Sequence, residues 1–223
     1  KDKDSSVALP LFTSCSPSWV KYIEYFYPER LNHLSTAKSP QQMFGAIVKT
    51  WYAQKEGIDP ADIVSVSLMP CSAKKFECER PEMNSSGYKD VDFALTTREL
   101  AGMIKESGID LPNLPESNFD DPLGTGTGAG QIFGASGGVM EAAIRTVYEI
   151  VTGREIPFEK LRIRPLRGTK GIRAAEFPIK KTVSDWKFLE GSTLRVMVGH
   201  GTANARKIIE MLLRGELDDY HFF

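Results

Sequence analysis

An apolar run from Ile63 to Leu68, closed by Met69, Pro70 and Cys71, constrains the fold of this chain most strongly. The run is rich in β-branched residues and bounded by turn-forming residues, and so predicts a buried strand. Cys71 therefore emerges at a strand end, with a lysine and a glutamate just behind it. A cysteine in that place is positioned to act as a metal ligand or as a nucleophile.

A second cysteine, Cys15, follows a predicted strand over residues 7–14 in the same way, which suggests one site shared with Cys71. Cys78 is the third cysteine, and its better interpretation is a structural one. Three cysteines make a poor disulfide framework and indicate a reducing compartment, in which thiols stay free for metals or catalysis. The residues alone leave a second interpretation open, in which all three are small buried side chains.

Strand and helix signals alternate along the chain. Ser16-Pro17 and Ser39-Pro40 each pair an N-cap residue with proline in the first helical turn, and so predict two helix starts. The other predicted elements are strands at 91–96 and 194–198, helices that begin near Thr97, Val139 and Ala203, and short strands and turns over 154–192. The alternation favours an α/β fold with mostly parallel sheets flanked by helices.

The length of 223 residues is enough for two small lobes around a common cleft. We expect these lobes at approximately residues 1–125 and 126–223, with the active site in the cleft between them. A formal net charge of -1 gives no overall field that would attract nucleic acid or an anionic membrane. No apolar stretch approaches the roughly 18 residues of a membrane helix. We therefore expect no membrane span and a cytoplasmic protein, or a periplasmic one if the N-terminus is processed.

A glycine-dense stretch from Gly124 to Gly138 precedes the helix predicted near Val139. It lacks the spacing of a dinucleotide loop and the Gly-Lys-Ser/Thr ending of a P-loop, so a phosphate cradle is disfavoured. We expect instead that the backbone here closely approaches a bulky group beside the helix start.

Long motifs in this sequence resemble the FeFe, or iron-only, hydrogenases. Residues 12–19 resemble the first signature of that family, and residues 69–77 resemble the second. The further segments that resemble the family are 34–42, 80–83, 92–100, 128–130 and 133–143. Because the resemblance covers nearly the whole sequence, the chain is identified as a member of the catalytic-domain family of the large subunit.

The resemblance implies a cofactor and an activity. The cofactor is a 4Fe–4S cluster joined through a cysteine sulfur to a diiron centre, which carries CO, cyanide and a bridging dithiolate amine. The activity is the interconversion of protons, electrons and molecular hydrogen, typical of anaerobic metabolism. The implied partners are a ferredoxin, or a ferredoxin-like domain or subunit, as electron donor, together with cofactor maturation proteins.

Matched by position, Cys71 would ligate the 4Fe–4S cluster, and Lys74 would hold a cyanide ligand through a charge-assisted contact. Ser35 would lie on the proton path. The residues expected around the diiron centre are Met69 and Phe133, which would form its walls, with Ser72, Gln41 and Ser39 nearby.

The first departure from the family lies in its first signature, where many relatives have two adjacent cysteines. The first of these relays protons to the bridging amine, and the second ligates the 4Fe–4S cluster. Here the pair is Cys15 and Ser16, and a serine hydroxyl is a poorer iron ligand than a thiolate. Three alternatives stay open: Cys15 as relay with Ser16 as ligand, Cys15 as ligand with Ser16 or water as relay, and Ser16 as a helix N-cap.

The second departure concerns the third signature, whose two further cysteines follow a segment like 220–222 and do not occur in this sequence. We expect this chain alone to supply at most two or three of four ligands, and a further segment or partner chain to supply the rest. The competing predictions are a non-catalytic relative, either a sensor or an iron–sulfur assembly factor, and a split subunit that docks on a partner.

Overall fold

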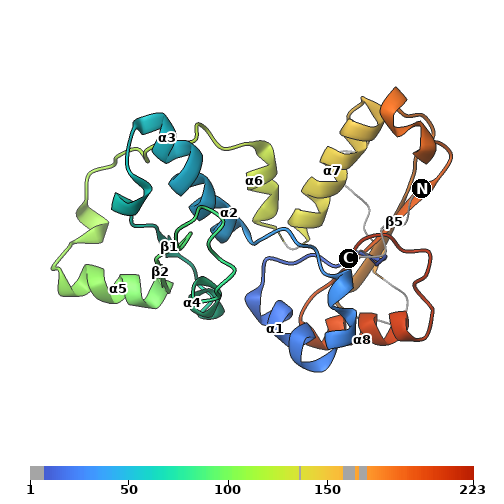
Figure 1. Ribbon diagram of the computed structural model, residues 1–223, viewed down its shortest axis with the longest axis horizontal. Helices are drawn as coiled ribbons and strands as arrows, with labels where there is room; N and C mark the ends of the chain where they lie inside the picture. The colour runs from blue at the N-terminus through green and yellow to red at the C-terminus, as the bar shows by residue number, and fades with distance from the viewer. Residues whose placement is uncertain (1–7, 136, 158–163, 166–169) are drawn as a thin grey trace. The chain divides into compact units, whose positions relative to one another are not determined.

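The computed structural model describes residues 8–135, 137–157, 164–165 and 170–223 (Figure 1). The chain forms two compact units. Unit 2 comprises residues 14–29 and 36–125. Unit 1 comprises the described residues of 1–13, 30–35 and 126–223. Of the segments singled out in the sequence, Val7, Ser136 and, within the short strands and turns predicted over 154–192, residues 158–163 and 166–169 lie outside the described residues.

Unit 2 contains a pair of parallel strands. β1 (Val66–Leu68) pairs with β2 (Phe93–Leu95), and Val66 lies opposite Phe93. The helices of this unit are α1 (Pro17–Phe26), α2 (Pro40–Ile47), α3 (Ala53–Glu56), α4 (Ala73–Cys78) and α5 (Thr97–Glu106), with a π-helical segment at Val48–Tyr52 and 3-10 helices at Pro60–Asp62 and Leu111–Asn113. Because α4 connects β1 to β2, the predicted parallel pairing is confirmed in this unit.

Both Ser-Pro pairs begin helices, as predicted. Pro17 and Pro40 lie in the first turns of α1 and α2, where the N–H that proline lacks has no helical partner. The second helix continues through the π-helical segment into α3 and ends at Gly57. The φ of Gly57 is 67°, a left-handed conformation that glycine adopts without a steric penalty.

The strand predicted over residues 63–68 is shorter and more exposed than its apolar pattern suggests. Val64, Val66 and Leu68 keep 64%, 55% and 49% of their surface exposed. The prediction that this strand is buried is therefore wrong for these side chains. The physical reason is an open groove of about 540 Å³, lined by these three residues and by side chains of α2 such as Phe44.

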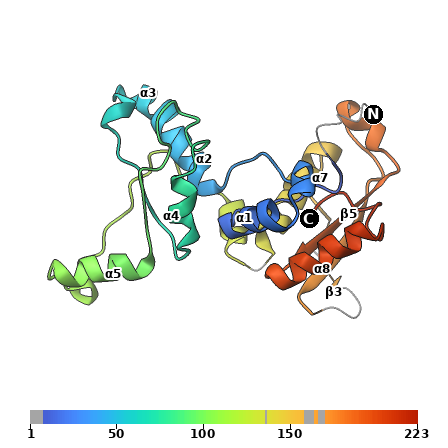
Figure 2. The same ribbon diagram turned by 60° about the horizontal axis from the view of Figure 1, so that its bottom comes forward.

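Unit 1 is built on an antiparallel sheet. Its strands are β3 (Arg164–Pro165), β4 (Ile172–Pro178) and β5 (Thr193–Gly199), paired in that order. Its helices are α6 (Gly128–Phe133), α7 (Gly138–Thr152) and α8 (Thr202–Leu213), with a 3-10 helix at Ser184–Leu189 and residues 30–33 of the 3-10 helix Pro28–His33. Met140 and Ile144 of α7 pack with Phe177 and Val196 of the sheet to form the core. Figure 2 shows α8 running beside β5.

The α/β class is confirmed, but the prediction of mostly parallel pairing is wrong for the β3–β4–β5 sheet. β4 and β5 are antiparallel because the chain returns through residues 179–192 without a crossover that would carry it back to the same end. Among the described residues of this unit, parallel pairing occurs as isolated bridges: Leu11 with Phe222, Val196 with Phe222, and Phe12 with Leu34.

The N-terminal segment pairs with the C-terminal segment. The N–H of Leu11 donates to the carbonyl of His221 at 2.9 Å, and the N–H of Phe223 donates to the carbonyl of Leu11 at 2.8 Å. Residues 8–13 therefore lie in unit 1, which differs from the contiguous division into residues 1–125 and 126–223. Within residues 8–14, the part of the predicted strand 7–14 that the structure describes, regular strand pairing is reduced to isolated bridges at Leu11 and Phe12.

The end of the glycine-dense stretch is a point of close backbone contact. A Cβ on Gly138 would lie 1.7 Å from the carbonyl oxygen of Ile132 in α6. The close approach that the sequence predicts is thus present at the start of α7. Its partner is the backbone of the preceding helix, and no bulky group is needed to explain it.

Gly45 in α2 offers a test of the packing in unit 2. A Cβ at Gly45 would lie 2.3 Å from the backbone oxygen of Asp90, so Gly45→Ala forces the loop away from the helix. We expect a loss of about 1–3 kcal/mol in the free energy of unfolding, measured by denaturant titration. Gly102 in α5 has open space around it, and Gly102→Ala should stabilise by about 0.5–1 kcal/mol. Equal effects of the two substitutions would contradict this packing.

Candidate active site

Lys74 connects the two cysteine segments of unit 2. Its Nζ donates to the carbonyl oxygen of Cys15 at 2.6 Å, and its backbone N–H donates to the carbonyl of Cys71 at 3.1 Å. The lysine is buried, whereas the thiols of Cys15 and Cys71 are free and exposed. A single residue thus holds the backbones of both cysteines, and the structure brings them together at one place in unit 2.

The ammonium of Lys74 is buried against the carboxylate of Glu77, one turn further along α4. Glu77 Oε2 accepts from Lys74 Nζ at 3.0 Å, from Ser39 Oγ at 2.8 Å and from Gln41 Nε2 at 3.2 Å. The side chains of Lys74 and Glu77 are only 8% and 7% exposed. A buried charge is costly unless it is paired and hydrogen-bonded, and these contacts meet both conditions.

Gln41 extends this network to β1. Its Oε1 accepts a hydrogen bond from Ser67 Oγ at 2.7 Å, while its Nε2 donates to Glu77. The amide also lies 3.2 Å from Cys78 Sγ. One buried amide therefore connects α2, α4 and β1.

Sequence reasoning named Ser39 and Gln41 as cofactor-binding residues and gave Glu77 no role. In the structure the polar groups of Ser39 and Gln41 contact Glu77, so their cofactor contact stays a prediction. The signal that could have given Glu77 a role is its spacing of three residues from Lys74, which on a helix places the two side chains on one face.

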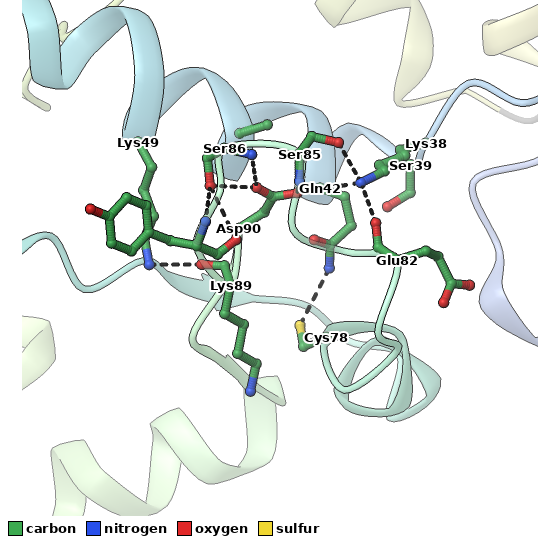
Figure 3. Close-up of polar contacts among 12 residues, drawn as sticks. Lys38, Ser39, Gln42, Lys49, Cys78, Glu82, Ser85, Ser86, Lys89 and Asp90 are labelled. Carbon is green, nitrogen blue, oxygen red and sulfur yellow. Dashed lines mark hydrogen bonds and ion pairs between the residues drawn. The ribbon is translucent and has the colours of Figure 1, made fainter. Parts of the chain in front are cut away.

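A second buried carboxylate, Asp90, fixes the loop that follows α4 (Figure 3). Its oxygens accept from the backbone N–H groups of Ser85 and Ser86, each at 2.9 Å, and from Ser86 Oγ at 2.7 Å. Lys38 Nζ lies 3.4 Å from Asp90 Oδ2. Because Lys38 directly precedes Ser39, the same contacts also fix the start of α2.

A second lysine ties this loop to the helical segment that follows α2. Lys49 Nζ donates to the carbonyl of Lys89 at 2.7 Å, as Figure 3 shows, and to Asp92 Oδ2 at 2.7 Å. The same carboxylate oxygen accepts from the N–H of Ser65, just before β1, at 2.7 Å. The loop after α4 is thus held at both ends, which leaves α4 little freedom to move relative to α2.

Cys78 differs from the other two cysteines. It is buried at the end of α4, and its sulfur accepts a hydrogen bond from the amide of Gln42 (Figure 3) and another from the amide of Gln41. Burial raises the pKa of the Cys78 thiol, and the neighbouring Glu77 carboxylate raises it further. A thiol of this kind stays protonated and is a poor ligand, which agrees with the structural interpretation of Cys78.

Ser16 occupies the N-cap position of α1, but its hydroxyl makes no capping hydrogen bond. Its backbone N–H donates to Ser14 Oγ at 3.2 Å, and the residue is exposed. The N-cap interpretation of Ser16 is therefore right about the position and wrong about the hydroxyl. The helix is instead begun by Pro17, which needs no hydroxyl cap.

The other predicted site residues are more dispersed. Ser72 is exposed at the N-cap of α4, and Met69, half-buried, donates its N–H to Leu95. Ser35 and Phe133 belong to unit 1, where Ser35 donates its N–H to Phe12 and Phe133 ends α6. The site roles of these four residues stay predictions.

Two negative findings apply to the residues that the structure describes. Among them, no group of three or more His, Cys, Asp or Glu side chains is arranged to hold a metal ion. No helix in the described ranges is both long and apolar enough to cross a bilayer.

Comparison with known proteins decides the family. The profile described as "Iron only hydrogenase large subunit, C-terminal domain" matches residues 2–223. The chain belongs to the iron-only hydrogenase large-subunit family. The FeFe-hydrogenase resemblance of the two cysteine signatures is thereby confirmed.

Two relatives carry hydrogenase names. The NADP-reducing hydrogenase subunit HndD of Solidesulfovibrio fructosivorans is 48% identical over 96% of this chain and 34% of its own length. The periplasmic Fe hydrogenase large subunit of Nitratidesulfovibrio vulgaris is 45% identical over 99% of this chain and 49% of its own length. The chain thus spans between a third and a half of these relatives.

A third relative carries a different kind of name. The cytosolic iron-sulfur assembly component 3 of Pongo abelii is 33% identical over 98% of this chain and 44% of its own length. Relatives of this chain therefore bear the names of hydrogenases and of an assembly component.

Solved structures agree on the fold of the family. An apo FeFe-hydrogenase from Chlamydomonas reinhardtii matches 96% of this chain and 57% of its own with a TM-score of 0.79 and 39% identity. A second FeFe-hydrogenase structure, concerned with oxygen inactivation at the H cluster, matches 98% of this chain and 58% of its own with a TM-score of 0.82 and 39% identity.

The Asp90 carboxylate makes the stability of unit 2 depend on pH. Burial alone would raise its pKa, but hydrogen bonds from Ser86 and Ser85 and the Lys38 ammonium outweigh burial and hold the pKa below its ordinary value of 3.8. A depressed pKa stabilises the fold fully above 3.8, and this stabilisation is lost as pH falls through the lower folded value. We expect Asp90→Asn to lower the free energy of unfolding at neutral pH by about 1–3 kcal/mol.

Denaturant titrations of the wild type and of Asp90→Asn across acidic pH test this expectation. The difference between the two proteins should be largest at neutral pH and should shrink below pH 3.8. Asp62→Asn, at an exposed position, serves as the matched control and should leave stability unchanged. A constant difference down to strongly acidic pH would contradict the assignment.

Proposed function

We propose that this chain forms part of the catalytic site of an iron-only hydrogenase, which interconverts protons and molecular hydrogen. The observation that carries the proposal is the buried Lys74 ammonium, which holds the backbone segment of Cys15 while its own N–H contacts Cys71. These three residues lie in the two motifs by which the chain resembles the family. The proposed cofactor is a 4Fe–4S cluster joined to a diiron centre with CO, cyanide and a dithiolate amine.

The chemistry of the donor set fits this group. Cys15 and Cys71 are free, exposed thiols, which are the soft donors that iron–sulfur clusters take. Lys74 carries three N–H donors, of which Cys15 and Glu77 accept two. In the described part of the chain the third has no acceptor, so it is available for an anionic ligand. Cys71 would ligate the 4Fe–4S cluster, and Lys74 would hold a cyanide.

The bound group supplies the redox chemistry, and the protein supplies position and protons. Lys74 fixes the carbonyl of Cys15, which confines the Cys15 thiol in either of its proposed roles, proton relay or ligand. The hydroxyl of Ser16 is not engaged as a helix cap, which leaves it able to serve as relay or weak ligand. Ser35 is proposed on the proton path, and Met69, Ser72 and Phe133 around the diiron centre.

The proposal extends to partners. The remaining cysteine ligands would come from a further segment or from a partner chain, in line with the greater length of the relatives. A ferredoxin or ferredoxin-like unit would deliver electrons, and maturation proteins would install the cofactor. We propose a cytoplasmic location, with a periplasmic one as the alternative, since one relative is named as periplasmic.

A second candidate function is iron–sulfur assembly without hydrogen chemistry. Two observations favour it: the 33% identity to the assembly component of Pongo abelii, and Ser16 where many hydrogenases have a cysteine. The presence of Lys74 favours the hydrogenase, because its unpartnered N–H suits a cyanide ligand. Infrared bands of CO and cyanide separate the two, since an assembly factor has no need of either ligand.

The proposed function is tested on the complete protein, matured with its full cofactor under anaerobic conditions. We expect hydrogen evolution from a chemical reductant and infrared bands from CO and cyanide. Cys71→Ala should abolish both, because the cluster loses a thiolate ligand.

Cys78→Ala is the matched control, since Cys78 is buried and protonated, and it should retain both signals. The hydrogenase proposal would be contradicted if the wild-type protein bound an iron–sulfur cluster but showed neither the CO and cyanide bands nor hydrogen evolution. That result would favour the assembly factor.

A further inference from the structure

We infer that Glu77 is the positioning residue that sets the direction of the Lys74 ammonium, and that Ser39 and Gln41 hold Glu77 for this purpose. The inference rests on the proposed function in one respect: the direction of the ammonium matters for an anionic ligand at this site. The contacts themselves are properties of the protein and are testable without any cofactor.

The hydrogen bonds of the Lys74 ammonium set its direction. The three N–H groups of a lysine ammonium point in a tetrahedral arrangement, so fixing two of them sets the direction of the third. Two are accepted, by the Cys15 carbonyl at 2.6 Å and by Glu77 Oε2 at 3.0 Å. Within the described residues the third meets no acceptor. Glu77 and the Cys15 carbonyl together therefore aim one N–H at a binding partner.

The carboxylate can do this because it is itself immobile. Ser39 Oγ and Gln41 Nε2 donate to the same Oε2 atom that accepts from Lys74, at 2.8 Å and 3.2 Å. Gln41 is in turn fixed by Ser67 on β1. Glu77 is thus held by two side chains from the start of α2, one of which is fixed in turn by β1, and its oxygen has few alternative positions.

Another lysine–glutamate pair with the same spacing shows that the arrangement is unusual for this chain. Lys21 and Glu24 on α1 are also three residues apart, but their side chains are 41% and 25% exposed and their closest N–O distance is 3.7 Å. A pair of that kind contributes little, because water screens it. Lys74 and Glu77 are almost fully buried, so a change of the carboxylate to a neutral group leaves the ammonium without its counter-charge.

The cofactor-free test measures how fast the Lys74 amine reacts with a water-soluble acetylating ester, with mass spectrometry of the complete apoprotein. A buried ammonium held by two acceptors reacts slowly. Glu77→Gln, which preserves shape and removes charge, should raise the rate at Lys74 by about tenfold or more. The exposed neighbour Lys75 is an internal reference, and its rate should stay the same in both proteins.

Two further variants keep this test decisive. Glu79→Gln removes a carboxylate from the same end of α4, but Glu79 is 69% exposed and pairs with Lys89, so the Lys74 rate should not change. Ser39→Ala removes one donor to Glu77 without changing its charge and should raise the rate by about twofold to fivefold. If Glu77→Gln does not fold, the acetylation rate of Lys74 in Ser39→Ala tests the inference by itself. A Lys74 rate that is unchanged in the variants that fold would overturn the inference.

The second readout uses the complete, matured protein and separates this inference from the proposed function. Glu77→Gln should shift a cyanide stretching band relative to the wild type, and Glu79→Gln should leave it in place. Absence of cyanide bands from the wild type, with the Lys74 rate still dependent on Glu77, would overturn the hydrogenase proposal and leave the positioning role standing. If the cyanide bands are identical in the wild type and in Glu77→Gln, Glu77 does not direct Lys74 toward a cyanide ligand, and that part of the inference is overturned.

Discussion

The buried ion pair of Lys74 and Glu77 is the interaction on which the rest of the site depends. Removing two charges from water is costly, and the cost is met only if every remaining donor and acceptor finds a partner. This requirement brings the start of α2, the strand β1 and the Cys15 segment to α4. In the described part of the chain, one N–H of Lys74 meets no acceptor beyond the Cys15 carbonyl and Glu77, and this N–H is the group proposed to contact a ligand.

The short helix α4 could not hold this arrangement alone. A helix of six residues is unstable in isolation, so the position of α4 is set by its surroundings. The loop after it is fixed by the buried Asp90 carboxylate and by Lys38 and Lys49, which reach it from either end of α2. The same contacts that stabilise unit 2 therefore fix the helix that carries Lys74.

Local sequence signals predicted the helices better than the sheets. The proline at each helix start and the glycine at the end of α3 act within one turn of chain, so Pro17, Pro40 and Gly57 were sufficient. Strand exposure and direction depend on distant segments. The apolar residues around Val66 predict a buried strand, but Val66 is exposed on a groove. The alternation of strands and helices favoured parallel pairing, but β4 pairs antiparallel with β5.

The sequence by itself determined the family and placed Cys71 at a strand end with Lys74 and Glu77 just behind it, because these features are local. Only the tertiary structure decided what surrounds them. Lys74 reaches a carbonyl 59 residues away in sequence, and Glu77 accepts from a serine 38 residues away. No local pattern encodes such pairings, since they follow from how the burial of two charges is compensated once the strands and helices have packed.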